Sequence, residues 1–331
     1  EVKDLEVTFD TKDGIVHAVN GISYTVNDGD TLGIVGESGC GKSVSCLALL
    51  RLLPTPPAKI MHGQALFEGT DLLSVPLDQM HTFRGSQIAM VFQDPMTSLN
   101  PVMTIGEQIS EAVQVNLKLS GKASRERTIE VLTHVGIPHA AERLGDYPHQ
   151  FSGGMRQRVM IAMAISCRPK LLIADEPTTA LDVTIQAQIV DLVKQLQQEL
   201  NMAVIWITHD LGVIARLTKH VNVMYAGYIV ESGPIKRIFA NPQHPYTIGL
   251  LGSVPHVELD TNQDLQFIEG APPDMVRLPQ GCTFAPRCIY RADQCLRAHP
   301  DLVEREPQHT AACLRLNEIH TQLQEDKREQ P

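Results

Sequence analysis

Residues 31–43 read TLGIVGESGCGKS, and this stretch decides the fold of the chain. Its opening, Thr31–Val35, predicts a buried strand that ends in a glycine-rich loop. Residues 36–43 match the pattern G-x-x-x-x-G-K-S, and a helix is expected from Lys42 to Leu53, where Pro54 stops it. Strand, glycine loop and helix in this order are the context that a phosphate-binding P-loop requires. An α/β fold that binds a nucleotide is therefore expected.

The glycine loop explains how phosphates would be held. Its backbone N–H groups can wrap phosphate oxygens, and the N-terminus of the following helix adds a favourable field. We expect Lys42 to reach the β- and γ-phosphates and Ser43 to bind Mg²⁺ through its hydroxyl oxygen. An ordinary glycine-rich turn is the alternative, which the flanking strand and helix disfavour. The residues of this segment expected to contact the nucleotide are Gly36, Ser38, Gly39, Cys40, Gly41, Lys42, Ser43 and Val44.

An acidic pair, Asp175 and Glu176, ends the apolar run Leu171–Ala174. The carboxylate of Asp175 can hold Mg²⁺ through water, and Glu176 is then placed to polarise an attacking water molecule. On its own, such a pair could equally be a solvated strand end. A P-loop in the same chain favours the catalytic interpretation.

Four further residues are candidates because of where they stand in the sequence. Gln93 and His209 each follow a predicted parallel strand, and ligands of open α/β sheets gather at such strand ends. Gln93 could contact Mg²⁺ or the attacking water, and His209 the γ-phosphate; a structural histidine is the alternative. Phe9 could stack on an adenine ring bordered by Val16, although a strand aromatic in the core is an equally good explanation.

A second phosphate-seeking element stands far from the P-loop, where residues 152–158 read SGGMRQR. Ser152, Gly153 and Gly154 present small side chains and free N–H groups at the start of a predicted helix. Such a helix N-terminus attracts a phosphate. Two elements so widely separated predict that one nucleotide is held between two copies of the fold.

The rest of the sequence alternates strands with helices. Residues 87–92, 171–174 and 203–208 are apolar runs, and residues 185–201 have helical periodicity. This alternation predicts a parallel sheet covered on both faces. Residues 94–168 have a helical pattern with few strand-like runs.

The character of the sequence changes near Ser232, after which prolines and turns become frequent. We therefore predict two domains: a nucleotide-binding domain over residues 1–232, with a helical subdomain at about 94–168, and an extension over residues 233–331. The extension is expected to be a small domain that needs help to fold. The polar end, residues 322–331, is expected to fray.

Composition excludes some classes of function. The 331 residues carry a net charge of −10, with a pI near 5.7, so a dominant nucleic-acid surface is not expected. No apolar run approaches the roughly 18 residues that cross a bilayer, and no basic start precedes an apolar core as in a signal peptide. Work at a membrane would therefore need other chains to provide the spans.

The motifs and their order resemble those of the ATP-binding cassette (ABC) ATPases of ABC transporters. That resemblance covers roughly residues 1–232. One departure is Met155, where glutamine is commoner, and it leaves the Ser-Gly-Gly core intact. The segments that carry the resemblance are the Walker A loop at residues 36–43, the Q-loop at Gln93, the signature at 152–157, the Walker B strand at 171–176, the D-loop at 180–182 and the switch His209.

A narrower resemblance is to the ATPases of dipeptide and oligopeptide importers, which carry a C-terminal extension. Residues 92–101 (FQDPMTSLNP), 244–247 (HPYT) and 281–288 (GCTFAPRC) are similar to that family. Residues 42–44, Lys-Ser-Val rather than Lys-Ser-Thr, resemble the "D" subunit more than its "F" partner.

The resemblance implies a RecA-like core with an antiparallel β subdomain and a helical subdomain. It implies a heterodimer with a second ABC ATPase, two transmembrane permease subunits and an extracytoplasmic peptide-binding protein, with no nucleic acid. This chain would lie peripherally on the cytoplasmic face of the inner membrane, and its hydrolysis of ATP with Mg²⁺ would energise uptake of dipeptides or oligopeptides. The helical segment after Gln93 would carry the permease contact, and Glu176 and His209 are both present for hydrolysis. The alternative, a non-transport ABC ATPase of DNA repair or translation, is disfavoured because the chain has one P-loop, no heptad run and no basic patch.

Four of the seven cysteines stand late in the chain, at Cys282, Cys288, Cys295 and Cys313. Their spacing matches neither ferredoxins nor paired zinc knuckles, so spacing alone predicts four thiolates for a soft metal, zinc or iron–sulfur. The resemblance to the peptide-importer extension implies a [4Fe–4S] cluster acting as a structural staple; zinc or unligated thiols are the alternatives. The other three cysteines, with Cys40 inside the P-loop, are expected to be small apolar fillers: Cys40, Cys46 and Cys167.

Overall fold

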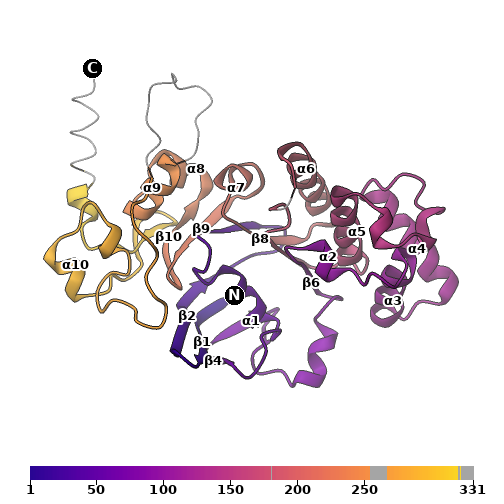
Figure 1. The fold of residues 1–331 in the computed structure, drawn as a ribbon, viewed down its shortest axis with the longest axis horizontal. Helices are drawn as coiled ribbons and strands as arrows, with labels where there is room; N and C mark the ends of the chain where they lie inside the picture. Colours follow the sequence, from indigo (N-terminus) through magenta and orange to yellow (C-terminus); the bar gives the residue numbers. More distant parts are fainter. Residues whose placement is uncertain (180, 254–266, 320, 322–331) are drawn as a thin grey trace, which may run out of the picture. The chain divides into compact units, whose positions relative to one another are not determined.

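The computed structural model describes residues 1–179, 181–253, 267–319 and 321. Figure 1 labels the helices and strands of the fold. The chain divides into two compact units. The first, here called the P-loop unit, comprises residues 1–25, 33–66 and 209–331. The second, here called the helical unit, comprises residues 26–32 and 67–208.

The N-terminal part of the P-loop unit is an antiparallel sheet. Strand β1 (Val2–Thr11) pairs with β2 (Gly14–Tyr24) on one edge and with β4 (Ala58–Phe67) on the other. Leu5 and Val7 are fully buried between solvent-exposed neighbours, as the alternation of a half-buried strand requires. The antiparallel pairing is the arrangement expected for the β subdomain.

Helix α1 (Lys42–Leu49) follows β3 (Thr31–Val35) and the glycine loop. The prediction that this helix continues to Leu53 was wrong. The chain leaves the helix at Leu50, and Arg51 takes a left-handed backbone conformation with φ of 51°. A single residue in that conformation cannot continue a right-handed helix, so the helix ends before the first proline is reached.

The C-terminal part of the P-loop unit is built on a run of antiparallel strands that belong to a larger sheet. Strand β10 (Tyr228–Pro234) pairs with β9 (His220–Tyr225), and on its other edge with β12 (His309–Ala311), which in turn pairs with β11 (Val303–Glu306). Late residues of the extension thus complete a sheet begun before Ser232. The division into a separate domain at residue 233 stays a prediction. The helices of this part are α7 (Leu211–Leu217), α8 (Ile235–Ala240), α9 (Pro245–Gly252), the 3₁₀ turn η4 (Ala285–Arg287) and α10 (Asp293–Arg297).

A buried polar network joins these elements. The carboxylate of Glu231 is fully buried and accepts hydrogen bonds from the backbone N–H groups of Gln243 (2.7 Å) and His244 (2.9 Å), and it lies 2.7 Å from Nε2 of His309. The Nδ1 atom of His244 accepts a bond from the N–H of Tyr246 and so caps α9. Burial lowers the pKa of His244 to about 4, which keeps this ring neutral and able to accept. The network holds β10, α9 and β12 together.

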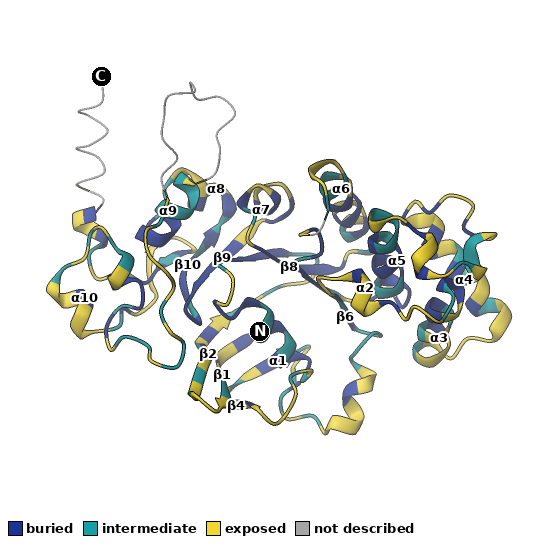
Figure 2. Cartoon of the chain, viewed as in Figure 1, coloured by how far each residue is buried: buried dark blue, intermediate teal, exposed yellow. Residues whose placement is uncertain are grey.

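The helical unit contains three parallel strands: β6 (Ile88–Val91), β7 (Leu171–Asp175) and β8 (Ala203–Thr208). β7 pairs with β6 on one side and with β8 on the other. All six residues of β8 are buried (Figure 2), as expected for a strand covered on both faces. Helix α6 (Val183–Leu200) buries Ile189, Val193 and Leu196 along one stripe. These strands and this helix are those that the sequence predicted.

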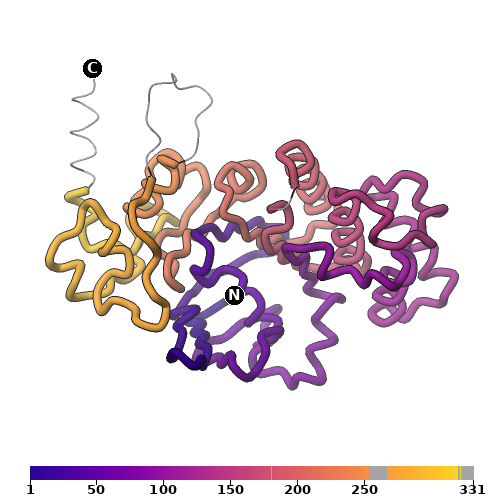
Figure 3. The backbone as a smooth tube through the Cα atoms, in the orientation of Figure 1, coloured from indigo at the N-terminus to yellow at the C-terminus, as the bar shows by residue number. Residues whose placement is uncertain are grey.

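The prediction that residues 94–168 are helical is confirmed. Every element assigned in this fully described stretch is a helix or a 3₁₀ turn, and its path can be followed in Figure 3. Thr104 and Glu107 form a capping box at the start of α3, which satisfies two free N–H groups. The elements are α2 (Pro95–Ser98), α3 (Ile105–Leu117), α4 (Gly121–His134), η2 (Arg143–Gly145), η3 (Pro148–Gln150) and α5 (Gly153–Ile165). Before them come β5 (Thr70–Asp71) and η1 (Leu77–Thr82).

Within the described part of the chain, the helices are either too short or too polar to cross a membrane.

Candidate nucleotide site

The P-loop has a backbone that two of its glycines make possible. Gly36 and Gly41 have φ values of +155° and +97°. A Cβ atom on Gly36 would lie 2.2 Å from the carbonyl oxygen of Met224, and one on Gly41 would lie 2.2 Å from that of Ala18. No larger residue fits at either position, so the glycines fix a loop that neighbouring backbone approaches closely.

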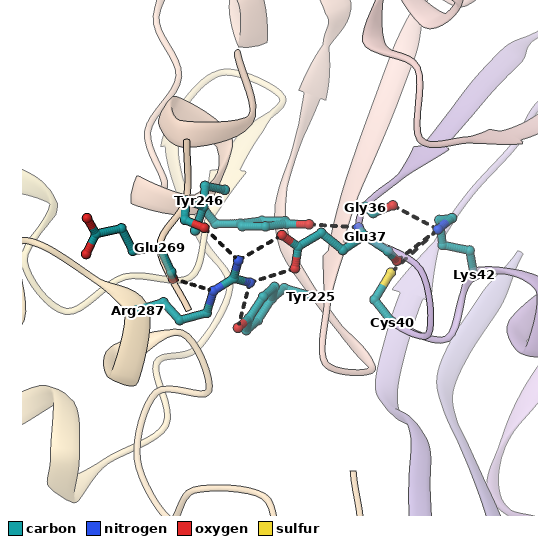
Figure 4. A network of polar contacts seen from close by, with 9 residues as sticks. Gly36, Glu37, Cys40, Lys42, Tyr225, Tyr246, Glu269 and Arg287 are labelled. Carbon is teal, nitrogen blue, oxygen red and sulfur yellow. Dashed lines mark hydrogen bonds and ion pairs between the residues drawn. The ribbon is translucent and has the colours of Figure 1, made fainter. Parts of the chain in front are cut away.

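Lys42 is the first residue of α1 and is 4% exposed. Its ammonium group donates to the carbonyl oxygens of Gly36 (2.8 Å) and Glu37 (3.0 Å), as Figure 4 shows. The thiol of Cys40 lies 4.0 Å from the same nitrogen and is buried. Ser43 is the next residue of the helix, and Val44 follows it. The arrangement places one positive charge inside a loop of backbone dipoles.

Sequence reasoning missed the residues that surround Glu37. The carboxylate of Glu37 pairs with the guanidinium of Arg287, and its N–H donates to the hydroxyl oxygen of Tyr246 (2.8 Å), both from the C-terminal extension. Arg287 and Tyr246 lie in segments 281–288 and 244–247, which carry the family resemblance. Nothing in their spacing pointed to the P-loop.

The two candidates for the adenine ring are neighbours. Phe9 on β1 and Val16 on β2 stand directly opposite each other in the antiparallel register, and both are half-buried. Opposite residues project from the same face of a sheet. One surface of the β1–β2 hairpin therefore carries both side chains, and their contact with a base stays a prediction.

In the helical unit, Gln93 and Glu176 meet at the carboxyl ends of adjacent parallel strands. The side-chain amide of Gln93 donates to Oε2 of Glu176 at 3.4 Å, and the hydroxyl of Thr179 donates to the same oxygen at 3.0 Å. Glu176 has a left-handed φ of 44°, and its N–H donates to the carbonyl oxygen of Ile207. A strained conformation held by its surroundings is typical of functional positions. Asp175, the last residue of β7, is 8% exposed.

The Ser-Gly-Gly turn forms the N-terminus of α5. Ser152 is the N-cap, and its hydroxyl oxygen accepts a bond from the N–H of Met155 at 3.4 Å. Ser152 and Gly153 are exposed, whereas a Cβ on Gly154 would lie 2.7 Å from the side chain of Ile185 on α6. The turn therefore offers solvent-facing groups at the positive end of a 13-residue helix.

The remaining predictions concern His209, Ala180 and the polar end of the chain. His209 follows β8 directly and is exposed; it is grouped with the P-loop unit, whereas Glu176 is in the helical unit. Ala180 of the predicted D-loop and the polar end at 322–331 lie outside the described residues.

The four late cysteines all belong to the P-loop unit. The N–H of Cys282 donates to the carbonyl oxygen of Cys295 at 2.8 Å, and the N–H of Arg315 donates to Sγ of Cys313 at 3.4 Å. Burial raises the pKa of Cys288 to about 12 against the lowering effect of a hydrogen bond from the Tyr290 backbone, and the charges of the other three thiols add to the rise; burial also raises the pKa of Cys313 to about 11. Across the described ranges, no three His, Cys, Asp or Glu side chains are grouped as a site for a metal ion. The other three cysteines are buried, as expected for small apolar fillers: Cys40, Cys46 and Cys167.

Comparison with protein families gives two matches. Residues 19–179 match the family described as "ABC transporter", and residues 230–295 match "Oligopeptide/dipeptide transporter, C-terminal region". The chain is 52% identical over 312 residues to the dipeptide transport ATP-binding protein DppD of Bacillus subtilis, covering 94% of this chain and 93% of that protein. It is 50% identical over 315 residues to the oligopeptide transport ATP-binding protein OppD of Salmonella typhimurium, covering 95% and 93%.

Solved structures confirm the cassette fold. A dimeric structure of the ATP-binding cassette MJ0796 bound to ADP and Pi is similar with a TM-score of 0.63 and 26% identity, over 71% of this chain and 97% of that one. The structure of cbiO1 from Clostridium perfringens is similar with a TM-score of 0.61 and 30% identity, over 73% and 92%. Motifs, fold and near full-length relatives agree. The chain belongs to the family of ATP-binding subunits of dipeptide and oligopeptide ABC transporters.

Proposed function

We propose that this chain is the ATP-hydrolysing subunit of a bacterial ABC importer that takes up dipeptides or oligopeptides. The observation that carries the proposal is the match of residues 230–295 to the C-terminal region of oligopeptide/dipeptide transporters. A cassette alone would be compatible with many ABC ATPases. The extension separates this chain from the non-transport class, which is not favoured.

The local geometry within each unit supports a separate role in hydrolysis for each of the candidate site residues. The glycine loop and Lys42 bind the β- and γ-phosphates, because their N–H and ammonium groups are the donors that phosphate oxygens need. The Ser43 hydroxyl and the mostly buried Asp175 carboxylate are oxygen ligands that suit Mg²⁺, which neutralises phosphate charge when bound. Glu176 polarises the attacking water, and Gln93 orients the Glu176 carboxylate. His209 is proposed to contact the γ-phosphate.

The open N-terminus of α5 supports pairing with a second ABC ATPase. Ser152 and Gly153 face solvent, so the helix can offer its N–H groups to a phosphate held by another molecule. The relative MJ0796 was solved as a dimer. By the proposal, the partner here is a different ATPase chain, so the assembly is a heterodimer that works on the cytoplasmic face of the inner membrane. An extracytoplasmic binding protein delivers the peptide.

The helical unit carries a surface suited to a permease. A cavity of about 700 Å³ lies over α3 and the start of α4, and its lining includes Val102, Thr104, Glu107, Glu111 and Val115. Val102 and Val115 are 80% and 69% exposed, and Arg125 joins the two glutamates in the lining, so the surface combines apolar groups with charges of both signs. We propose that a cytoplasmic segment of a permease binds there.

Uptake by the reconstituted transporter tests the assignment. Vesicles containing this chain, its partner ATPase and both permeases should take up labelled peptide only with ATP and the peptide-binding protein. Val102→Asp should lower uptake at least about tenfold, because a charge would be buried in the permease contact. Leu77→Asp, at an exposed apolar residue of η1, is the matched control and should transport normally. Peptide-independent ATP use with no uptake of any peptide would contradict the proposed cargo.

We further propose that the four late thiols hold a [4Fe–4S] cluster that staples the extension, with zinc as the alternative. Support comes from the influence of neighbouring thiols, because the charges of Cys282, Cys295 and Cys313 help to raise the pKa of Cys288, and a metal centre would relieve that repulsion.

Metal analysis of anaerobically purified protein distinguishes the [4Fe–4S] cluster from a zinc site. About four iron and four sulfide per chain are expected for the cluster. Cys288→Ser should lose most of this iron and lower the thermal midpoint, whereas Cys167→Ala, at a buried thiol of the helical unit, should retain the iron. One zinc per chain without iron would show that the four thiols hold zinc instead of the cluster.

A further inference from the structure

A carboxylate stands inside the phosphate-binding loop. Glu37 directly follows Gly36, the first glycine of the loop, and its backbone carbonyl accepts from the ammonium of Lys42 at 3.0 Å. The loop attracts anions through its N–H dipoles and its lysine. An uncompensated negative charge at Glu37 would oppose that attraction and repel the triphosphate.

Arg287 supplies the compensation. Its Nη1 and Nη2 atoms donate to the two carboxylate oxygens of Glu37 at 2.6 and 3.0 Å, in a bidentate ion pair (Figure 4). The side chains are 5% and 27% exposed, so solvent screens the pair weakly. The paired geometry is the strong form of this interaction, and lysine cannot reproduce it.

The guanidinium is itself held in place by the extension. Its Nε atom donates to the carbonyl oxygen of Glu269 at 3.0 Å, and Nη2 donates to that of Ile268 at 3.2 Å. Nη1 also lies 3.4 Å from the hydroxyl of Tyr225 on β9. Because the donors of Arg287 are directed to fixed acceptors, the position of Glu37 is set by the fold of the extension.

The backbone of Glu37 is fixed from the same side. Its N–H donates to the hydroxyl oxygen of Tyr246, a fully buried residue of α9. The Tyr246 ring packs against the rings of Tyr225 and Phe284, with centroids 4.6 and 5.5 Å away. The N–H, the carbonyl and the carboxylate of Glu37 are therefore all engaged, two of them by residues after position 240.

The extension also reaches the hairpin that carries the adenine candidates. The N–H of His17 on β2 donates to the carbonyl oxygen of Met275 at 2.9 Å. A Cβ on Gly14 would lie 2.7 Å from the side chain of Val276, so the two segments are in close contact. Residues 275–276 thus lie beside the turn that follows Phe9.

We propose that Arg287 is a positioning residue of the ATP site: it neutralises Glu37 and holds the P-loop in its phosphate-binding shape. The C-terminal extension is by this inference a working part of the nucleotide site. The inference depends on ATP binding by the P-loop, and neither on the cargo nor on the metal content of the extension.

Removing the two charges separately and together provides the test, in which ATP binding to the purified full chain is measured. Arg287→Gln should raise the Kd for ATP about tenfold, because Glu37 is left unpaired beside the phosphates. Adding Glu37→Gln to that variant should restore the Kd to within about threefold of wild type, and Glu37→Gln alone should bind ATP at least as well as wild type. The matched control is Arg291→Ala, at an exposed arginine of the same extension, which should leave the Kd unchanged.

If Arg287 only supported the fold, Glu37→Gln would not restore ATP binding in the Arg287→Gln variant. Restored binding therefore distinguishes charge neutralisation from a structural role. A wild-type Kd in Arg287→Gln overturns the proposal, and so does a raised Kd that the second substitution fails to lower. Should Arg287→Gln not fold, as judged by its thermal midpoint, Arg287→Lys takes its place. This variant keeps a charge but loses the paired bonds, so a Kd raised about threefold is expected and a wild-type Kd overturns the proposal. Because only ATP binding is measured, failure here leaves peptide transport untouched.

Discussion

Glu176→Gln is expected to lower ATP hydrolysis by about 10²- to 10⁴-fold while ATP binding is retained. The amide keeps the size of the side chain and can still meet Gln93 and Thr179, which contact Oε2 of Glu176 at 3.4 and 3.0 Å. It loses the negative charge that draws a proton from the attacking water. Steady-state phosphate release by the assembled transporter, with the Kd for ATP measured in parallel, checks both halves of this expectation.

The position of Glu176 makes the substitution informative. Its φ of 44° and the bond from its N–H to Ile207 fix where the carboxylate points, and both depend on backbone that glutamine leaves unchanged. Glu142→Gln, at a side chain 82% exposed in the same unit, is the control and should hydrolyse ATP at the wild-type rate. Near-normal turnover in Glu176→Gln would show that another group orients the water.

Lys42→Ala should abolish measurable ATP binding, raising the Kd by about two orders of magnitude or more. Lys42 is 4% exposed, and its ammonium donates to two carbonyl oxygens of the loop. Its removal takes away the charge that phosphate oxygens require and leaves those carbonyls without their donor. Equilibrium binding of ATP to the purified chain measures the effect.

The control for Lys42→Ala is a lysine of the same unit that lies at the surface. Lys59 on β4 has a side chain 58% exposed, and its pairing with Asp10 at 3.4 Å is of the weak surface kind. Lys59→Ala should therefore bind ATP normally. An ATP affinity close to wild type in folded Lys42→Ala would remove the assignment of the P-loop.

Local patterns predicted the elements whose residues interact with near neighbours. Strand β7 was recognised because its apolar run is buried on both faces, and α6 because its buried residues recur with helical spacing. Strand β4 was missed, since half of its side chains are exposed in an irregular pattern and its partner is β1, more than forty residues earlier. β12 is a comparable case, because two of its three residues pair with β10, more than seventy residues earlier in the chain. Strands that pair with partners far away in the chain are hard to recognise from local sequence patterns.

The contacts of the candidate site likewise include some that the sequence predicted and some that it did not. The meeting of Gln93 with Glu176 was foreseen in outline, because neighbouring parallel strands bring their carboxyl ends together. The contact of Glu176 with Thr179 was not foreseen, although it lies three residues away. The tight turn after β7 that creates it depends on the left-handed backbone at Glu176.

By itself, the sequence determined the phosphate-binding loop, since Lys42 bonds to carbonyls five and six residues before it and the glycines act where they stand. It also determined the family, through motifs spread over the chain. Only the tertiary structure decided what surrounds the loop, because the ion pair of Glu37 with Arg287 joins residues 250 positions apart. The sheet that β12 completes and the buried Glu231 network bring that arginine to the loop, and contacts at such separations follow from packing rather than from any local pattern.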